Sequence, residues 1–531
     1  MRGGLWLEGL RRAVMVAGLA IAAFTLSVSS AHSPAEAEET VLDPRFGLIE
    51  PHDAPDQADA LGVGWGRARF HWARIQPNGP DEWVEAELTA EELARERQAG
   101  REVIGLLIGV PDWARDADGL PRGLYLPCDD PGNLWAGFVR QAVTRYRGQI
   151  DHWIVWNEPD VWDPEHPGYT WPGDERDYIQ LLRVAYLTAR DANPDAVIHL
   201  AAVSHWWDAL YDRELYFRRL LDALVAEPDA AAHGYFYDVA TLHLYFNPAS
   251  IYELIELYAD IQAEYGIDKP IWLVETNAAP SSDPAWVVPE PTFRVSLLEQ
   301  AAYMPQALAL SLAAGAERVG IYKLIDTPGD YAANPEPFGL LRGDGFPRPA
   351  YRTAQVAIRQ LAGAQQITWT DRGVVAQVVV ERSGQLTRLL WSRLPYAQIV
   401  EVPALSAEAV LVDMWGNSRP LVPQNGRYTV VLPGGECQQT TGDYCMIGGP
   451  PVYLIESLPS GVAVSAGGDL LSVEAMDEET YFTTLVIDSR RGGFSGSPLQ
   501  WVAAIGGVVL ALAVGGMALA GRVRRRNDVG S

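Results

Sequence analysis

Short apolar runs and longer amphipathic runs alternate along most of the chain, between residues 45 and 362. The short runs are rich in Val, Ile, Leu and aromatic residues and are often apolar throughout, which is typical of parallel strands covered on both faces. They span residues 46–50, 64–72, 103–109, 150–156, 197–203, 239–245, 271–275 and 318–324. This alternation restricts the region to a fold in which strands and helices follow one another in turn.

The longer runs between these strands are predicted helices. The first connection, near residues 56–61, is short, and the next helix begins at Thr89 with Glu92 three residues later, a capping-box spacing. The others cover residues 134–147, 177–191, 215–226, 251–265, 294–314 and 350–361. Eight strands with about eight helices predict an α/β fold of the (β/α)8 TIM-barrel type over residues 45–362. A doubly wound open sheet is the alternative, but it usually has fewer strands and a Gly-rich loop after the first.

The sequence pattern changes after residue 362. Short strand-like runs now alternate with turn signals such as Ser383-Gly384, Gly416-Asn417 and Asn425-Gly426. The runs lie at residues 367–369, 374–381, 387–391, 409–414, 428–432 and 452–455. Close spacing of this kind predicts a small antiparallel β-sandwich domain over residues 363–458. Residues 459–500 are richer in Ser, Gly and acidic residues, and we expect a stalk or linker there.

The N-terminal segment is typical of a secretory signal. Arg2, Arg11 and Arg12 precede an uncharged run, and small residues follow it. We therefore expect residues 1–37 to direct export, with an uncleaved N-terminal anchor as the alternative.

The C-terminal segment predicts a transmembrane helix. Residues 501–521 contain no charged side chain, and a helix of that length spans a hydrocarbon core of about 30 Å. Arg522, Arg524, Arg525 and Arg526 follow at once, so the positive-inside rule makes residues 522–531 a cytoplasmic tail. A buried helix of a soluble domain is the alternative and leaves the arginines unexplained. We expect a single-pass protein of the cell membrane whose barrel is extracellular.

The net charge disfavours one class of partner. The 531-residue chain has 41 basic and 68 acidic side chains, a formal net charge of −27, which disfavours binding to nucleic acid.

Cys437 and Cys445 are close enough in sequence to form a small disulfide loop, which leaves Cys128 over.

Two glutamates stand where the predicted barrel would carry its chemistry. The strand at 150–156 leads into Asn157-Glu158-Pro159, and the strand at 271–275 ends at Glu275. The C-terminal ends of barrel strands form one rim, so these carboxyl groups face each other across its mouth. Such a pair suits glycosidic bond cleavage: one carboxyl protonates the leaving oxygen, and the other, ionised, attacks the anomeric carbon or activates water. A single glutamate in such a place is more often a surface ion-pair partner.

The sequence around Glu158 carries a family resemblance. Trp156-Asn157-Glu158-Pro159 resembles the Asn-Glu-Pro signature of clan A glycoside hydrolases, which are retaining enzymes built on a TIM barrel. The resemblance covers roughly residues 45–362 and implies that Glu158 is the acid/base and Glu275 the nucleophile. The trailing β domain is similar to the sandwich appended to family 39 and some family 5 members.

Further positions match the clan and imply substrate-binding roles. Arg69 lies in the second strand, where the clan has an arginine beside the nucleophile, and a plain barrel-lining ion pair is its alternative. His243 and Tyr245 match a His-x-Tyr at the end of the sixth strand. The match implies that His243 makes a hydrogen bond to a substrate hydroxyl, and the alternative is that His243 is a buried core residue. It also implies that Tyr245 donates a hydrogen bond to the nucleophile. Asn157 can donate to a sugar 2-hydroxyl. Trp113 lies in a sequence that resembles the clan's Pro-x-Trp.

The chain departs from the clan in the eighth strand. The clan usually has a tryptophan there, whereas this strand contains Tyr322-Lys323-Leu324. The departure leaves open the floor of the subsite next to the cleaved bond, and with it the substrate. Among the tryptophans in or near the predicted loops we expect two to serve as platforms for sugar rings and the rest to pack; they are Trp113, Trp162, Trp171, Trp206 and Trp207.

These features together predict a retaining O-glycoside hydrolase. It acts on extracellular oligo- or polysaccharides through a covalent glycosyl-enzyme intermediate and needs no cofactor. The nine histidines show no metal-ligand spacing, so no metal site is expected. Two alternatives remain open, namely a non-catalytic glycan-binding or cell-wall-associated barrel and a transglycosylase that uses the same residues.

Overall fold

The computed structural model describes residues 42–330, 336–458 and 471–475. No helix in these ranges is long and apolar enough to cross a membrane. The predicted signal segment, residues 1–37, and the predicted membrane span, residues 501–521, lie outside the described residues.

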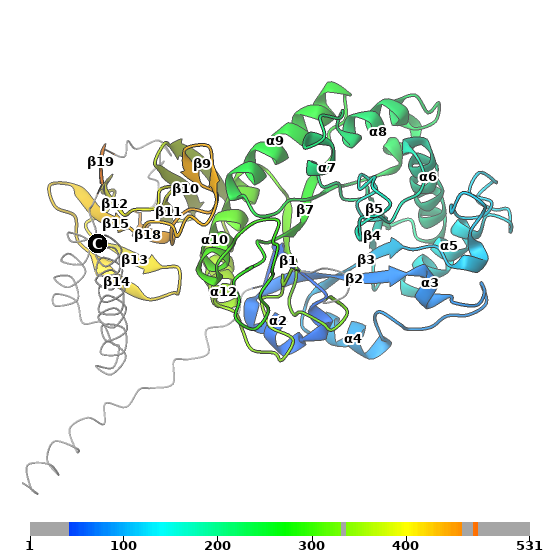
Figure 1. Ribbon diagram of the computed structural model, residues 1–531, viewed down its shortest axis with the longest axis horizontal. Coiled ribbons are helices and arrows are strands. Elements are labelled where there is room, and N and C mark those ends of the chain that lie inside the picture. The colour runs from blue at the N-terminus through cyan, green and yellow to red at the C-terminus, as the bar shows by residue number, and fades with distance from the viewer. Residues whose placement is uncertain (1–41, 331–335, 459–470, 476–531) are drawn as a thin grey trace, which may run out of the picture. The chain divides into compact units, whose positions relative to one another are not determined.

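Eight parallel strands form the barrel (Figure 1). Their order around the sheet is β5-β4-β3-β2-β1-β8-β7-β6. The strands are β1 (Asp43–Ile49), β2 (Val63–His71), β3 (Glu102–Ile108), β4 (His152–Val155), β5 (Val197–His199), β6 (Ala240–His243), β7 (Ile271–Thr276) and β8 (Arg318–Ile321). Parallel bridges from His199 to Val239 and from Val203 to Leu242 join the two ends of this order. The sheet is therefore closed, and the open doubly wound alternative is excluded.

The helices between the strands follow the predicted sequence ranges within a few residues. They are α2 (Pro55–Leu61), α4 (Ala90–Gln98), α5 (Leu134–Tyr146), α6 (Glu175–Ala192), α8 (Tyr216–Val225), α9 (Pro248–Glu264), α10 (Leu297–Ala313) and α12 (Pro349–Leu361). Thr89 and Glu92 form the predicted capping box of α4. Asp174 and Ser296 form equivalent capping boxes that set the starts of α6 and α10.

Large aromatic side chains pack on both faces of the barrel sheet, and Trp153 lies on the outer one, against Tyr146 of α5. Trp65 and Trp153 are fully buried, and each lies over a glycine of a neighbouring strand. A Cβ atom on Gly47 would come within 1.9 Å of the Trp65 ring, and one on Gly105 within 2.4 Å of the Trp153 ring. The two glycines are required because the indole rings occupy the space that a side chain would take.

Antiparallel sheets follow the barrel. The larger one has the strand order β14-β13-β18-β11-β10-β9 and the smaller one β15-β12-β19. The strands are β9 (Gln366–Arg372), β10 (Val375–Arg382), β11 (Gln385–Ser392), β12 (Gln398–Pro403), β13 (Ala409–Asp413), β14 (Ser418–Leu421), β15 (Arg427–Leu432), β18 (Val452–Ser457) and β19 (Leu471–Ala475). Residues of both sheets, among them Val375, Leu390, Val400 and Val430, share one apolar core. The larger sheet therefore packs on the smaller one as the sandwich pattern predicts.

One strand lies inside the segment that the sequence indicated to be a linker. Leu471–Ala475 forms strand β19. It pairs with the edge of β12 that is opposite β15. The expectation of a stalk over the whole of residues 459–500 is wrong for these five residues. The free edge of β12 offers unpaired N–H and C=O groups, and the extended segment pairs with them.

The other face of the larger sheet packs against the barrel helices (Figure 1). Ala376, Val378 and Leu389 belong to the same apolar core as the barrel. Gln306, buried in the middle of α10, donates to the carbonyls of Gly448 and Gly449 at 3.1 and 3.2 Å and accepts from the Gly448 N–H at 3.2 Å. The barrel and the β domain are thus joined by a continuous core and by buried hydrogen bonds.

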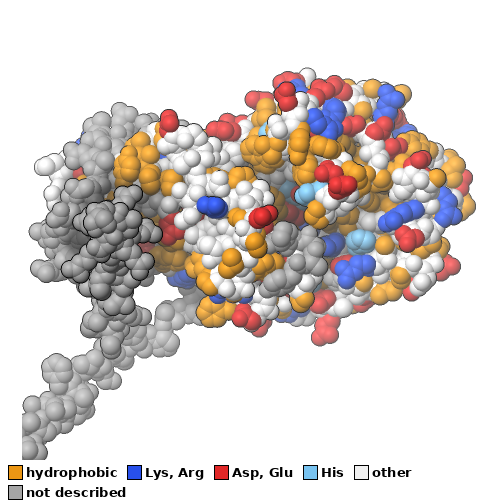
Figure 2. Space-filling view, viewed as in Figure 1, with side chains coloured by type: hydrophobic (Ala, Val, Ile, Leu, Met, Phe, Trp, Pro, Cys, Tyr) orange, Lys and Arg blue, Asp and Glu red, His pale blue; other side chains and the backbone are white. Residues whose placement is uncertain are grey.

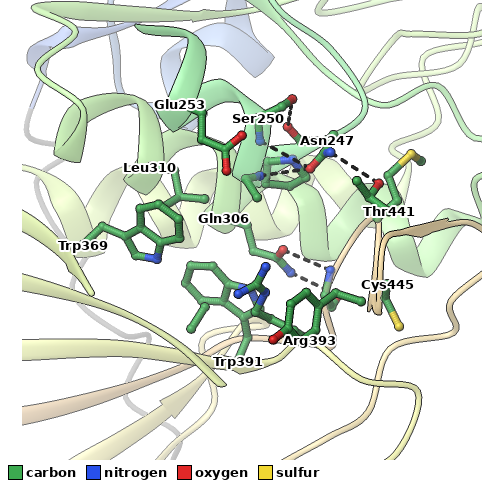
Figure 3. A pocket seen from close by; sticks show the side chains of 16 residues that line it. Asn247, Ser250, Glu253, Gln306, Leu310, Trp369, Trp391, Arg393, Thr441 and Cys445 are labelled. Carbon is green, nitrogen blue, oxygen red and sulfur yellow. Dashed lines mark hydrogen bonds between the residues drawn. The ribbon is translucent and has the colours of Figure 1, made fainter. Parts of the chain in front are cut away.

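A cavity of about 110 Å³ lies at this junction (Figure 3). Trp369 and Trp391 line it from the β domain, and Asn247 and Glu253 line it from the start of α9. A disulfide joins Cys437 to Cys445 beside it, and Cys128 is free. The predicted small disulfide loop is therefore present, and it borders the contact between the two folds.

Candidate active site

The two predicted carboxylates lie together at the C-terminal ends of β4 and β7. Glu275 belongs to β7, and Glu158 follows β4 by three residues. The Glu158 N–H donates to the Ala202 carbonyl at 3.0 Å, which ties the loop after β4 to the loop after β5. Trp156 and Glu158 both have positive φ angles, 78° and 46°. Left-handed backbone is unfavourable for such residues and is retained where the surroundings impose it, as at functional sites.

Glu275 is buried among groups that favour its ionised form. Its side chain is 7% exposed, and Oε1 lies 2.5 Å from Nη1 of Arg67, whose side chain is 4% exposed. The Tyr245 hydroxyl donates to Oε2. Burial alone would raise the pKa of Glu275, but the charges of Arg67 and His243 and the bond from Tyr245 bring that pKa below its ordinary value. Glu275 is therefore a carboxylate at neutral pH.

The arginine beside Glu275 is Arg67 and not Arg69, so the predicted contact of Arg69 is wrong. The two arginines are two residues apart on β2 and share one face of the strand, because side chains alternate with a period of two. Arg67 pairs in register with Ile49 and lies one level deeper in the barrel. Arg69 is closer to the mouth, where its Nη2 lies 2.8 Å from Oε1 of Glu50.

Glu158 is more accessible than Glu275. Its side chain is 21% exposed, and Oε1 lies 2.8 Å from Nδ1 of His243. The same nitrogen lies 3.4 Å from Oε2 of Glu275. One oxygen of each glutamate and this imidazole nitrogen lie within 4.8 Å of one another. The two carboxyl groups thus face a common point at the mouth of the barrel.

His243 lies between the carboxyl groups. Its side chain is 1% exposed, and its Nδ1 faces both glutamates, so it has the buried position of the core-histidine alternative. The hydrogen bond from His243 to a sugar hydroxyl stays a prediction. A divalent cation bound by Glu158, His243 and Glu275 would have to compete with Arg67 and Tyr245, which already hold the two oxygens of Glu275. The three groups therefore suit proton and charge positioning better than metal binding.

Asn157 and Trp113 lie near the mouth of the barrel. Hydrogen bonds hold the backbone of Asn157 and the indole ring of Trp113 in place. The Asn157 carbonyl accepts a hydrogen bond from the Thr170 hydroxyl at 2.8 Å, and the half-buried side chain adjoins Glu158. Trp113 donates from Nε1 to the Gln76 carbonyl at 2.7 Å and packs edge-on against Trp72. Trp113 thus also packs as part of the wall after β3.

The loop tryptophans divide into buried and exposed groups. Trp171 is 2% exposed and packs against Trp156 and Tyr178, so it belongs to the core. Trp162 and Trp206, on the loops after β4 and β5, are 37% and 38% exposed. The edge of Trp162 also contacts the ring of Trp207.

A buried carboxyl group follows Glu158 by two residues. Asp160 is 3% exposed, and its Oδ2 accepts from the N–H and the hydroxyl of Ser204, both at 2.8 Å. Its Oδ1 is buried and has no hydrogen-bond partner among the residues that the structure describes. Burial, and then the charge of Glu158, raise the pKa of Asp160 to about 7.

Sequence reasoning did not identify a group of charged residues beside Glu275. Lys323, one of only two lysines in the chain, lies 2.8 Å from Oε2 of Glu50 and 3.1 Å from Asp330. Glu50 also binds Arg69, as described above. The departure at Tyr322-Lys323 was the visible signal, but nothing local to it indicates Glu50, which lies 273 residues earlier.

The visible face of the barrel shows no continuous basic surface. In Figure 2 acidic and basic side chains are interspersed with apolar ones there.

Solved structures of glycoside hydrolases resemble the chain. A family 39 glycoside hydrolase from Bacteroides cellulosilyticus WH2 superimposes with a TM-score of 0.56 at 17% identity, covering 78% of this chain and 81% of that one. A glucosidase from Croceicoccus marinus gives 0.53 at 13% identity, covering 80% and 96%. CelM2, a bifunctional glucanase-xylanase from a metagenome library, gives 0.51 at 13% identity, covering 79% and 97%.

Sequence comparison gives a more distant similarity. Beta-glucosidase-like SFR2, chloroplastic, from Oryza sativa subsp. japonica is 25% identical over 158 residues. The match covers 28% of this chain and 23% of that protein, so the chain spans about a quarter of the relative's length. No protein-family model matches the chain. The shared architecture is nevertheless clear: residues 43–361 have the clan A-like TIM-barrel fold of glycoside hydrolases.

Proposed function

We propose that the protein is a retaining glycoside hydrolase in which Glu275 is the nucleophile and Glu158 the acid/base. The observation that carries the proposal is that two carboxyl groups lie close together in different environments. Glu275 is buried and held ionised by Arg67 and Tyr245, whereas Glu158 is partly exposed to the mouth.

The separation favours the retaining mechanism. Retaining pairs lie about 5–5.5 Å apart, and inverting pairs about 6.5–9.5 Å, because the latter leave room for a water molecule. An oxygen of Glu158 lies within 4.8 Å of one of Glu275, which supports the shorter class. Direct attack of Glu275 on the anomeric carbon then needs no intervening water.

The reaction proceeds in two displacements. Glu158 donates a proton to the glycosidic oxygen while an oxygen of Glu275 bonds to the anomeric carbon, and the leaving group departs as an alcohol. Glu158, now ionised, then accepts a proton from water, whose oxygen displaces Glu275. Arg67 and Tyr245 hold the Glu275 carboxylate in position for attack and stabilise it again when it departs. His243 holds Glu158 at the required distance.

The acceptor and the location extend the proposal. We propose an oligo- or polysaccharide as the substrate, and transfer to a sugar in place of water would use the same two carboxyl groups. We further propose, from the terminal segments alone, that the barrel is exported and anchored in the cell membrane by residues 501–521.

Azide rescue tests the assignment of the two roles. In Glu275→Ala we expect turnover of aryl glycosides to disappear and added azide to restore it, with an inverted glycosyl azide as the product. In Glu158→Ala we expect a large loss only for poor leaving groups, and azide should give a product of retained configuration. Exchanged stereochemistry would reverse the roles, and full activity of either variant would remove this site from the reaction.

A further inference from the structure

Four adjacent strands bring a group of charged residues to the same rim as the nucleophile. Strands β7, β8, β1 and β2 are neighbours in the barrel. The Tyr322 N–H donates to the Thr276 carbonyl, beside Glu275, and the Leu324 N–H to the Ile49 carbonyl, beside Glu50. The Glu50 N–H donates to the Arg67 carbonyl at 3.0 Å. The segment with Tyr322 and Lys323 therefore lies between Glu275 and Glu50.

The charged side chains of this rim are paired through Glu50. Its Oε1 lies 2.8 Å from Arg69, and its Oε2 lies 2.8 Å from the Lys323 amine. The Lys323 amine also lies 3.2 and 3.1 Å from the two carboxylate oxygens of Asp330. Glu50, Arg69, Lys323 and Asp330 are called the charged wall below.

Two features of the charged wall are costly for stability alone. The Lys323 side chain is 4% exposed and that of Glu50 is 13% exposed, so their ion pair has lost most of its hydration. Glu50 also has a φ of 54°, a left-handed conformation that its side chain disfavours. Apolar residues of similar size would serve packing at a lower cost, which favours a function for the wall.

The charges of the wall balance, so it has no free positive charge for an acidic ligand. Lys323 and Arg69 face the carboxylates of Glu50 and Asp330, and the charge of Arg67 is matched by Glu275. Burial raises, and the charges of Lys323 and Arg69 lower, the pKa of Glu50, to about 2, so the balance holds at neutral pH.

Hydrogen-bonding capacity does remain in the wall. Among the described residues Glu50 is the only hydrogen-bond partner found for the Arg69 guanidinium, which has five N–H groups, and its side chain is 36% exposed. Each Glu50 oxygen has accepted one bond and can accept another. Donors and acceptors side by side match hydroxyl groups, which both donate and accept.

We infer that Glu50 and Arg69, held by Lys323, bind hydroxyl groups of the sugar whose anomeric carbon meets Glu275, and that they select a neutral sugar over a uronic acid. The inference rests on the proposed function. It assigns to this subsite hydrogen bonds from a charged wall, in the place where clan A enzymes usually have a tryptophan. A sugar carboxylate there would meet the carboxylates of Glu50 and Glu275, while the charges of Arg69 and Lys323 are already matched by Glu50 and Asp330.

Matched pairs of substrates test the selection. The full chain is assayed with 4-nitrophenyl glycosides of neutral hexoses and with the corresponding uronides, in both anomeric forms. We expect the neutral member of the preferred pair to have a kcat/KM at least about a hundredfold higher. Preferred cleavage of a uronide would overturn the inference and leave the proposed function standing. Failure to cleave any glycoside of either series would overturn both.

Variants of the wall test the hydrogen bonds. Glu50→Gln and the more exposed Arg69→Gln should each lower kcat/KM for the preferred neutral glycoside about 10- to 100-fold, the range of a hydrogen bond to a charged group. The loss should largely vanish for the deoxy analogue that lacks the hydroxyl bound by the altered residue. Equal losses for all deoxy analogues would show a structural role only and refute the inference. Arg140→Gln, which removes an exposed ion pair with Asp191 elsewhere, is the control and should change none of these values.

Discussion

Replacing Arg67 by methionine should move the acid limb of the pH–activity profile upward. Arg67 pairs with Glu275 at 2.5 Å in a site where both side chains are less than a tenth exposed. With charge centres about 4 Å apart and an effective dielectric constant of about 20, the interaction lost is about 4 kcal/mol. Burial then acts on Glu275 with its strongest opposing charge removed, although His243 and Tyr245 still favour the ionised form, so the carboxylate takes up a proton at higher pH.

The shift follows from that free energy and is measured as kcat/KM against pH. Because 1.36 kcal/mol corresponds to one pH unit, the acid limb should rise by as much as about three units, and Arg67→Lys should recover part of the shift. Arg69→Met is the matched control on the same face of the same strand and should move the acid limb far less. An unchanged limb in Arg67→Met, in a protein with a normal circular dichroism spectrum, would refute the assignment of Glu275 as the group that must be ionised.

Three further predictions concern stability and topology. Gln306→Leu leaves the buried N–H of Gly448 unpaired and should lower the free energy of unfolding by about 1–3 kcal/mol without changing KM, as thermal denaturation and kinetics would show. The folded state keeps Asp160 protonated to a higher pH than the unfolded chain does, so stability is lost as the pH rises towards about 7; Asp160→Asn should abolish this loss in urea titrations at pH 5 and 8, and an unchanged difference would contradict it. Protease added to intact cells should digest the barrel and spare residues 522–531, and a barrel protected until lysis would refute the proposed topology.

The proximity of the two proposed catalytic glutamates could be predicted because its signals are local. Glu158 and Glu275 each follow an apolar run, and parallel barrel strands bring such ends to one rim whatever the loops do. The choice between Arg67 and Arg69 could not be made in the same way. Both point into the barrel, and which one is level with Glu275 depends on the stagger of β2, β1, β8 and β7 against one another, which no single strand's sequence contains.

The pairing of Lys323 with Glu50 lay beyond the sequence for a related reason. The two residues meet because β8 closes the barrel against β1, and closure joins segments at opposite ends of the fold. The burial of α10, in contrast, can be inferred from its own sequence. Its sequence is apolar on nearly all sides, which is typical of a helix enclosed by packing and not of one that faces solvent.

The enclosure of α10 has a consequence for truncation and for exchange of parts. A fragment that stops at Leu361 would contain every group of the proposed catalytic site, yet it would present to water the face of α10 that Gly448, Gly449 and the larger sheet cover. Such a fragment should aggregate, and a barrel from another protein grafted onto this β domain would need a matching helix. The smallest part of the chain that can fold as a unit therefore includes the β domain as well as the barrel.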